Sequence, residues 1–377
     1  MHLIKKRLIQ CQEMNLWRKR EMRLGDELCF RGNDYLGLAH HPQIIVAFKE
    51  ALEAYGVGSK GSALLGGYHP SHQALEEALA LFMGFPKALV FSTGYMANLA
   101  VITTLAKTLN LTEIFSDRLN HASIYDGILL GHLKLQRFKH KDYQHLNTLL
   151  TQSSSSAPKL CYSEGVFSVD GDVADLPEML RIIRAHSGMV VLDDAHGFGV
   201  LGENGRGTLE HHHLSADDVP LVMGTFGKAL GTFGAFVVGT EDLIQLLIQY
   251  ARSYIFTTAL PPALAASTLV SLKVMQAENW RREYLKKIIK HFRYQANRLG
   301  IPLLPSSTPI QLIFTYDPHT TVQCYTILKQ KGCWVGALRP PTVPEGLCRL
   351  RINLTASHCL SDINRLLEAL TCIKKFI

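Results

Sequence analysis

The sequence predicts an α/β protein with a mostly parallel central sheet covered by helices, together with a smaller α/β C-terminal domain. From residue 88 onward, short apolar segments alternate with helical patterns, which is typical of parallel sheets with helices on both faces. Past about residue 270 the alternation gives way to a long helix and a few short strands. A chain of 377 residues is long enough for two or three such lobes.

Each expected element follows from its local pattern of apolar residues. Strands are expected at 88–92, 113–117, 159–164, 189–194, 221–226 and 235–239, and helices at 95–108, 121–131, 176–186 and 242–254. Further strands at 310–316 and 349–355 precede a closing helix. We expect an N-terminal segment at 1–40 that packs with the small domain, a large cofactor-binding domain at 41–265 and a small domain at 266–377.

Charge and composition argue against several classes of function. The net charge is +7, but only residues 4–23 are locally basic, and an amphipathic surface helix with Ile4, Leu8 and Cys11 on one side is favoured there over nucleic-acid binding. Neither a signal peptide nor a membrane span is expected, since the most apolar later stretch, 254–270, contains two prolines. The eight cysteines form no C-x-x-C pair, which favours reduced, buried thiols in a cytoplasmic protein.

Two nucleotide-binding motifs are nearly present, and each lacks an essential part. Gly227-Lys228 is followed by Ala229, where a P-loop needs Ser or Thr. Residues 197–202 spell G-x-G-x-x-G, but a polar turn follows where a dinucleotide site needs a helix, so a dehydrogenase is not favoured. The histidines at 211–213 have no further ligand at a suitable spacing, and a solvated loop is expected there instead of a metal site.

Polar residues end several of the predicted strands, where ligands of parallel α/β sheets bind. They are Ser92, Asp117, Glu164, Asp193 and Thr225.

The helix after Ser92 begins with the amides of Gly94, Tyr95 and Met96. Such a start can bind an anion, or Ser92 or Thr93 can cap it; the sequence leaves both possibilities open.

Two adjacent carboxylates end the buried strand at 189–194. Strand alternation sends Asp193 and Asp194 to opposite faces, so one of them points into the ligand crevice. A carboxylate buried there needs a cationic partner, such as the protonated ring nitrogen of a cofactor. His196 follows three residues after Asp193, and His121 opens another helix.

Lys228 lies in a glycine-rich turn between two apolar segments. Glycines on both sides let another group approach closely, and a lysine in an apolar crevice can act as nucleophile or base. An anion site, a buried Asp, a nearby His and an activated Lys together describe a pyridoxal phosphate site. The helix start would hold the phosphate, the Asp would pair with the pyridinium nitrogen, and Lys228 would form the Schiff base.

The chain resembles the α-oxoamine synthases, which are fold type I pyridoxal phosphate enzymes, from about residue 30 to the end. Nine motifs in order carry the resemblance: "GNDYLGLAHHP", "GSKGSALLGGYHPSHQALEEALA", "FSTGYMANLAV", "DRLNHASIYDG", "SEGVFSVDGD", "LDDAHGFGVLGENGRG", "TFGKALGTFGAF", "SYIFTTALPP" and "LRINLTASH".

The resemblance implies a role for each residue around the cofactor ring. Lys228 would hold the cofactor, Asp193 would pair with the ring nitrogen, and His196 would hydrogen-bond the ring phenolate. His121 would stack on the ring face and orient the incoming carbonyl, and Ser168 would lie near the phenolate.

The resemblance also implies a shared phosphate site. The amides of Gly94 and Tyr95 and the hydroxyl of Thr225 would bind the phosphate, and Thr258 would reach the phosphate of the other subunit, so that a homodimer is expected.

For the substrate, Asn33 and Arg351 would hold the amino-acid carboxylate, as suits the fork of an arginine, and Arg18 or Arg20 matches an arginine of the family's N-terminal segment.

The family joins an amino acid to an acyl thioester with loss of CO₂. Members that use glycine with short or succinyl acyl groups carry Arg at the place of Ala63, so this chain is expected to join L-alanine to a pimeloyl thioester of coenzyme A or acyl carrier protein. Glycine with an acetyl donor, or a serine palmitoyltransferase-like reaction, is the alternative. Lys60 and Leu64 depart from the family's pattern beside the acyl pocket. Some members are catalytically inactive partners without the lysine, but Lys228 is present here.

Overall fold

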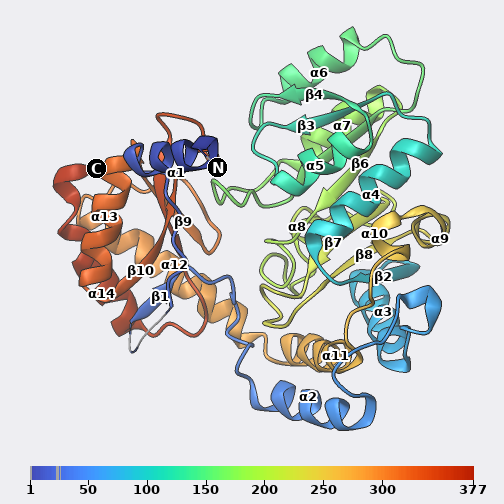
Figure 1. Ribbon diagram of the computed structural model, residues 1–377, viewed down its shortest axis with the longest axis horizontal. Helices are drawn as coiled ribbons and strands as arrows, with labels where there is room; N and C mark the ends of the chain where they lie inside the picture. The colour runs from blue at the N-terminus through green and yellow to red at the C-terminus, as the bar shows by residue number, and fades with distance from the viewer. Residues whose placement is uncertain (1, 23–24, 26) are drawn as a thin grey trace. The chain divides into compact units, whose positions relative to one another are not determined.

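The computed structural model describes residues 2–22, 25 and 27–377. The chain divides into two compact units, each of which can be followed by its colours in Figure 1. The large unit comprises Leu36–Ser168 and Val173–Arg282. The small unit comprises the described residues up to Tyr35, the short segment Val169–Asp172, and Glu283–Ile377. The division into an N-terminal segment and two domains that we expected from the sequence stays a prediction.

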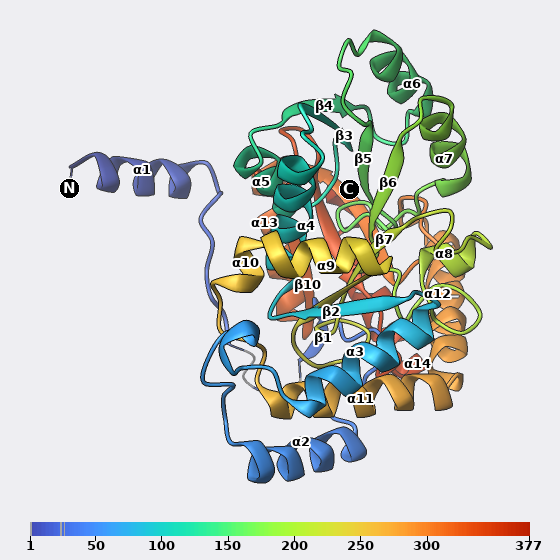
Figure 2. The ribbon, with the colours of Figure 1, turned by 90° about the vertical axis from the view of Figure 1, so that its right-hand side faces the viewer.

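A seven-stranded sheet forms the centre of the large unit (Figure 2). Strand β8 is antiparallel to both of its neighbours, and the remaining strands pair in parallel. This arrangement confirms the predicted α/β fold with a mostly parallel sheet. In spatial order the strands are β2 (Lys87–Phe91), β8 (Ala235–Gly239), β7 (Leu221–Thr225), β6 (Met189–Asp193), β5 (Leu160–Glu164), β3 (Glu113–Asp117) and β4 (Lys134–Phe138).

Helices cover this sheet because its strands carry apolar side chains on both faces. One apolar core includes Ile102 of α4, Val191 of β6 and Leu247 of α9, all of them buried. The helices of the large unit are α2 (Pro42–Tyr55), α3 (Pro70–Met83), α4 (Gly94–Thr108), α5 (Ala122–Leu130), α6 (Tyr143–Gln152), α7 (Leu176–Ala185), α8 (Thr208–His211), α9 (Glu241–Tyr250), α10 (Arg252–Ile255) and α11 (Pro262–Ala277), with a 3₁₀ turn η1 at Ala63–Leu65.

The small unit contains a four-stranded sheet in the order β1-β10-β11-β9. Strand β1 pairs in parallel with β10, and the other pairs are antiparallel. The hydroxyls of Ser306 and Thr308 both donate to the carbonyl of Gly171 at 2.7 Å, which ties the segment Val169–Asp172 into this unit. The elements are α1 (His2–Glu13), β1 (Leu28–Phe30), α12 (Trp280–Arg298), β9 (Ile310–Tyr316), α13 (Pro318–Gln330), β10 (Cys333–Leu338), β11 (Cys348–Asn353), α14 (Leu360–Thr371) and η2 (Lys374–Phe376).

The elements differ from the sequence-based expectation in several places. The helix expected at 242–254 is interrupted at Ala251, whose backbone is extended, and continues as the separate turn α10. Strand β4 and helix α6 were not expected, and neither were β1, β10 and α13. Strand β4 reads Lys-Leu-Gln-Arg-Phe, and of these only Phe138 is buried, so this edge strand lacks the apolar pattern that marked the others.

The cysteines differ in part from the expected burial. All eight are free thiols; Cys161, Cys324, Cys333 and Cys348 are buried, whereas the expectation is wrong for the exposed Cys11, Cys359 and Cys372.

The surface helix predicted within the basic segment 4–23 is present as α1 only as far as Glu13, and the described residues 16–22 that follow are not helical. Ile4 and Leu8 are both exposed. Over the part of the chain that the structure describes, no helix combines the length and apolarity that crossing a membrane would need.

Candidate active site

The candidate site of the large unit is built where β5, β6 and β7 end side by side. In the parallel register Glu164 lies opposite Asp193, and Asp193 lies opposite Met223, two residues before Thr225. The polar residues predicted at these three strand ends therefore share one edge of the sheet, as the rule for parallel α/β sheets requires.

Asp193 is buried, with 4% of its surface exposed, and both of its carboxylate oxygens accept hydrogen bonds. The side-chain amide of Asn98 donates to Oδ2 at 2.8 Å, and the backbone amide of Ala195 donates to Oδ1 at 3.0 Å. Asn98 in turn donates to Ser123 Oγ at 2.8 Å and accepts from the Tyr162 hydroxyl at 2.7 Å. The orientation of Asp193 is thus fixed by a buried polar chain.

Asn98 was missed by the sequence analysis. It lies on α4 among buried apolar residues, and a polar side chain within an otherwise buried apolar stripe was the signal that could have identified it.

Asp194 points to the other side of β6. Its carboxyl accepts from the Thr208 backbone amide at 2.7 Å and from the Thr208 hydroxyl. Burial raises the pKa of Asp194 to about 7. A Cβ atom on Gly197 or Gly207 would collide with this carboxyl. Gly197 and Gly207 therefore make room for the buried carboxyl of Asp194, whereas a Cβ on Gly199 would meet Ala229 and one on Gly202 would meet the Glu210 carboxylate. Each of these glycines is thus packed against protein atoms.

Glu164 is a second buried carboxyl at the same sheet edge, with 2% of its surface exposed. It accepts the Ser168 backbone amide at 3.0 Å, which fixes the turn that carries Ser168. Burial and the neighbouring charge of Asp193 raise the pKa of Glu164 to about 8.

Lys228 is half-buried in the turn between β7 and β8. After the dominant effect of burial, its positive charge lowers the pKa values of Glu164 and Asp194, which places the ammonium group near both carboxyls. The turn is held tightly: the Leu230 carbonyl accepts from Ser271 Oγ at 2.6 Å. Gly231 has φ +63°, and a Cβ there would overlap the backbone of Ala39.

The two predicted histidines differ in their exposure to solvent. His121 is the exposed N-cap residue of α5, and its Nδ1 lies 2.8 Å from Ser123 Oγ. Because Ser123 also bonds Asn98, His121 and Asp193 belong to one hydrogen-bonded chain. His196 is buried in the turn that follows β6.

The predicted phosphate side contains the start of α4. Thr93 is the N-cap residue, and its hydroxyl accepts the Met96 amide at 3.2 Å. The amides of Gly94 and Tyr95 precede the first amide that can bond within the helix. Thr258 is exposed, and its carbonyl accepts from Ser92 Oγ at 3.2 Å. Capping and anion binding are thus compatible, since they use different amides.

Thr225 lies in the strand that leads to the Lys228 turn. Its hydroxyl donates to the Gly234 carbonyl at 2.9 Å and accepts from the Gly227 amide at 3.4 Å.

The expected carboxylate-binding residues lie in the small unit. Arg351 Nη2 donates to Asn33 Oδ1 at 3.2 Å, and Asn353 and Tyr35 donate to the same oxygen at 3.0 and 3.1 Å. Asn33 and Arg351, which are 318 positions apart, are therefore brought together within this unit.

Arg18 is exposed and donates to Thr342 Oγ1 at 3.4 Å. Both residues line an open cavity in the small unit, together with Arg31 and Arg339.

Comparison with known proteins identifies the family. A model of the family described as aminotransferase class I and II matches residues 26–370. The 8-amino-7-oxononanoate synthase of Saccharophagus degradans is 50% identical over 343 residues, which cover 91% of this chain and 86% of that protein.

Two solved structures are similar in fold and sequence. Serine palmitoyltransferase from S. paucimobilis, solved with a bound PLP–myriocin aldimine, has a TM-score of 0.88 at 33% identity and covers 93% of this chain and 87% of that one. The 8-amino-7-oxononanoate synthase of Francisella tularensis has a TM-score of 0.81 at 32% identity, with 93% and 98% covered. The chain therefore belongs to the aminotransferase class I and II family and, within it, to the group of the 8-amino-7-oxononanoate synthases.

Proposed function

We propose that this protein is a pyridoxal phosphate-dependent acyltransferase that condenses L-alanine with a pimeloyl thioester, giving 8-amino-7-oxononanoate, CO₂ and the free thiol. This is the reaction expected from the name of its 50% identical relative, and it is a step of biotin synthesis. One observation of the site carries the proposal: a buried, hydrogen-bonded Asp193 ends β6 directly opposite Glu164 at the end of β5, and the charge of the half-buried Lys228 acts on Glu164.

The residues present fit the cofactor by the chemistry of their polar groups. The start of α4 offers backbone amides to a phosphate, as helix N-termini commonly do. The Asp193 carboxylate, held by Asn98 and Ala195, offers negative charge to a protonated ring nitrogen. The Lys228 amine would be the nucleophile that holds the cofactor.

When bound, the cofactor supplies an electron sink for negative charge at the α-carbon of the amino acid. Lys228 Nζ, freed from the cofactor when the amino acid binds in its place, would remove the α-proton and later return a proton to the product as a basic amine of this site. Asp193 would keep the proton on the ring nitrogen, and His196 and Ser168 would lie near the ring oxygen. His121, exposed at the start of α5, orients the carbonyl of the acyl donor.

Substrate selection is assigned to the small unit and to η1. Asn33 and Arg351 bind the alanine carboxylate, and Arg18 or Arg20 contributes from the N-terminal segment. Ala63, Leu64 and Leu65 of η1 supply apolar surface for a long methylene chain; Leu64 and Leu65 are 49% and 82% exposed in the single chain. Each methylene group buried there stabilises the complex by about 0.8 kcal/mol.

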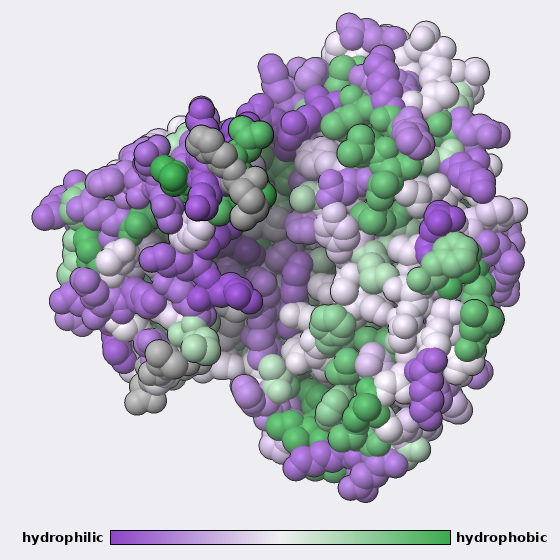
Figure 3. Space-filling view, in the orientation of Figure 1, coloured by the Kyte–Doolittle hydropathy of each residue, from purple (hydrophilic) through white to green (hydrophobic). Residues whose placement is uncertain are grey.

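We further propose a homodimer with shared sites, in the cytoplasm. Thr258 is exposed although its carbonyl is held by Ser92, as a residue that serves a partner's phosphate should be. Figure 3 shows apolar side chains gathered on the surface of the large unit. The exposed large apolar residues of that unit include Val57, Leu65 and Leu81. Burying such a surface favours association. Free thiols suit a reducing compartment.

The test is kcat/KM for alanine, glycine and serine, each crossed with acetyl, succinyl, pimeloyl and palmitoyl thioesters of coenzyme A and acyl carrier protein. We expect alanine with a pimeloyl donor to give the highest value. Glycine should be a poor substrate instead of an excluded one, because one methyl group in a pocket contributes only about 1–3 kcal/mol. A Lys228→Ala control should fold and show no turnover. A highest value for serine with the palmitoyl donor would contradict the proposal.

A further inference from the structure

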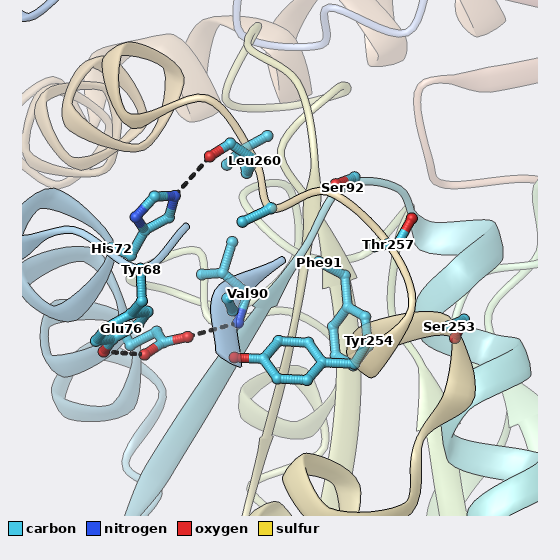
Figure 4. Close-up of a pocket in the computed structure, with 12 residues that line it drawn as sticks. Tyr68, His72, Glu76, Val90, Phe91, Ser92, Ser253, Tyr254, Thr257 and Leu260 are labelled. Atoms are coloured by element: carbon cyan, nitrogen blue, oxygen red, sulfur yellow. Dashed lines mark hydrogen bonds between the residues drawn. The ribbon is translucent and has the colours of Figure 1, made fainter. Parts of the chain in front are cut away.

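Helix α3 places two polar side chains, His72 and Glu76, one turn apart beside a small pocket (Figure 4). Neither residue has a role in the reaction described above. The pocket is also lined by Ser92 and Thr257, which adjoin the phosphate-binding residues Gly94, Tyr95 and Thr258. The two side chains therefore lie next to the proposed phosphate site, where they can fix the positions of the residues that form it.

Glu76 binds the outer side of the edge strand β2. Its Oε1 accepts the Val90 backbone amide at 2.9 Å, and its Oε2 accepts the Tyr68 hydroxyl at 2.7 Å, as the dashed lines in Figure 4 show. Among the strands that the structure describes, β2 lies at the edge of the sheet beside β8, so an outward amide of β2 needs a partner from outside the sheet. Val90 is two residues before Ser92 and four before Gly94, so this bond fixes the strand end that carries the phosphate turn.

His72 binds the segment that carries Thr258. Its Nε2 donates to the Leu260 carbonyl at 2.6 Å, and its Nδ1 accepts the His69 amide at 3.0 Å. These two bonds require a neutral ring with the proton on Nε2, and burial lowers the pKa of His72, which favours that neutral form.

Three successive backbone carbonyls of this segment each accept a hydrogen bond from a side chain. Ser92 Oγ donates to the Thr258 carbonyl at 3.2 Å, Ser59 Oγ donates to that of Ala259 at 2.6 Å, and His72 donates to that of Leu260. A backbone held at three consecutive residues has little freedom to move. The position of Thr258 is thus set by α3 and by the phosphate turn together.

We propose that Glu76 and His72 are positioning residues for cofactor phosphate binding: through α3 they fix both the Ser92–Tyr95 turn and the Thr258 segment. The inference rests on the proposed function, in which the phosphate binds at the start of α4. Neither residue touches the cofactor. Their effect should therefore fall on the part of the affinity that the phosphate contributes and not on the part that Lys228 contributes.

The experiment compares two ligands that differ only in the phosphate. The full-length protein is freed of cofactor and titrated with pyridoxal 5′-phosphate and with pyridoxal, and each dissociation constant is followed by visible absorbance. The dissociation constant for pyridoxal divided by that for pyridoxal 5′-phosphate measures the contribution of the phosphate alone. In Glu76→Leu we expect this ratio to fall at least about tenfold, the scale of one lost hydrogen bond to a charged group, with little change in the affinity for pyridoxal.

Conservative and control variants sharpen the result. Glu76→Gln keeps an oxygen acceptor for the Val90 amide and should stay within about threefold of the wild-type ratio. Glu77→Leu, at the exposed neighbour on α3, should leave the ratio unchanged. If Glu76→Leu does not fold, Tyr68→Phe removes one donor to Glu76 and should give a smaller selective loss of about threefold.

Equal losses for both ligands, or an unchanged ratio in Glu76→Leu and in Tyr68→Phe, would overturn the inference. A wild-type protein that binds pyridoxal as tightly as its phosphate would overturn the proposed function on which the inference rests.

Discussion

Asp193 and Asp194 are adjacent in the sequence and end the same buried strand, yet their surroundings differ. On the side of Asp193, Asn98, Ser123 and Tyr162 form a buried polar chain. On the side of Asp194, Thr208 supplies two donors, and glycines at 197 and 207 leave just enough room for the carboxyl.

The end of strand β6 therefore serves two purposes. The polar chain fixes the orientation of Asp193, which we propose faces the ligand, whereas the bonds to Asp194 join the turn after β6 to the start of α8 and satisfy the carboxyl within the protein. We therefore assign the chemistry to Asp193 and the stability of the fold to Asp194. Four substitutions test this separation.

Asp193→Asn should have the largest effect. The amide keeps the size of the side chain but cannot hold a proton on the cofactor ring, so kcat should fall by about 100- to 10,000-fold. The thermal unfolding midpoint should stay close to that of the wild type. Steady-state kinetics and a melting curve check both, with Asp194→Asn as the matched control. A larger activity loss in the control would reverse the assignment of the two carboxylates.

Asn98→Ala should have the next largest effect. The substitution removes the side-chain donor to Asp193 Oδ2, so kcat should fall by about 10- to 100-fold. The KM for alanine should change little, because Asn98 has no place in carboxylate binding. Asn120→Ala, which breaks a neighbouring buried network without touching Asp193, is the control. An equal loss of kcat in both variants would mean that general disruption of the core explains the effect.

Asp194→Ala should act on stability instead. Both Thr208 donors lose their acceptor in a buried place, which should lower the free energy of unfolding by about 2–3 kcal/mol. Urea unfolding measures this change. The kcat per folded molecule should stay within about threefold of the wild type. A large loss of kcat without loss of stability would show that the chemistry extends to the Thr208 side.

The smallest effect concerns pH. Burial raises the pKa of Asp194 to about 7, above its value in the unfolded chain, so the folded state binds its proton more tightly. The stability from this group is complete below the unfolded-state pKa and is lost as pH rises toward 7. Asp194→Asn imitates the protonated form and should therefore gain stability relative to the wild type between pH 4 and 7. A constant difference between the two proteins over this range would contradict the raised pKa.

Much of this architecture could be predicted because most strands of the large unit are buried on both faces and read as apolar segments. Strand β4 was not predicted because an edge strand with Lys, Gln and Arg has no such pattern. The interruption at Ala251 was not predicted because one residue with an extended backbone leaves the apolar pattern unchanged. In the site, strand alternation separated Asp193 from Asp194 correctly. It could not find Asn98, since the partner of a buried carboxylate comes from a different element.

The pairing of β1 with β10 has a consequence for the order in which the protein takes shape during synthesis. The strands of the large-unit sheet all lie between Lys87 and Gly239, whereas β1 pairs with residues at Cys333–Val335. At roughly 5–20 residues per second, a ribosome needs roughly 15–60 s to make the chain between β1 and its partner. Throughout this time β1 has no strand to join, so the first strand of the chain to be made is among the last to be paired.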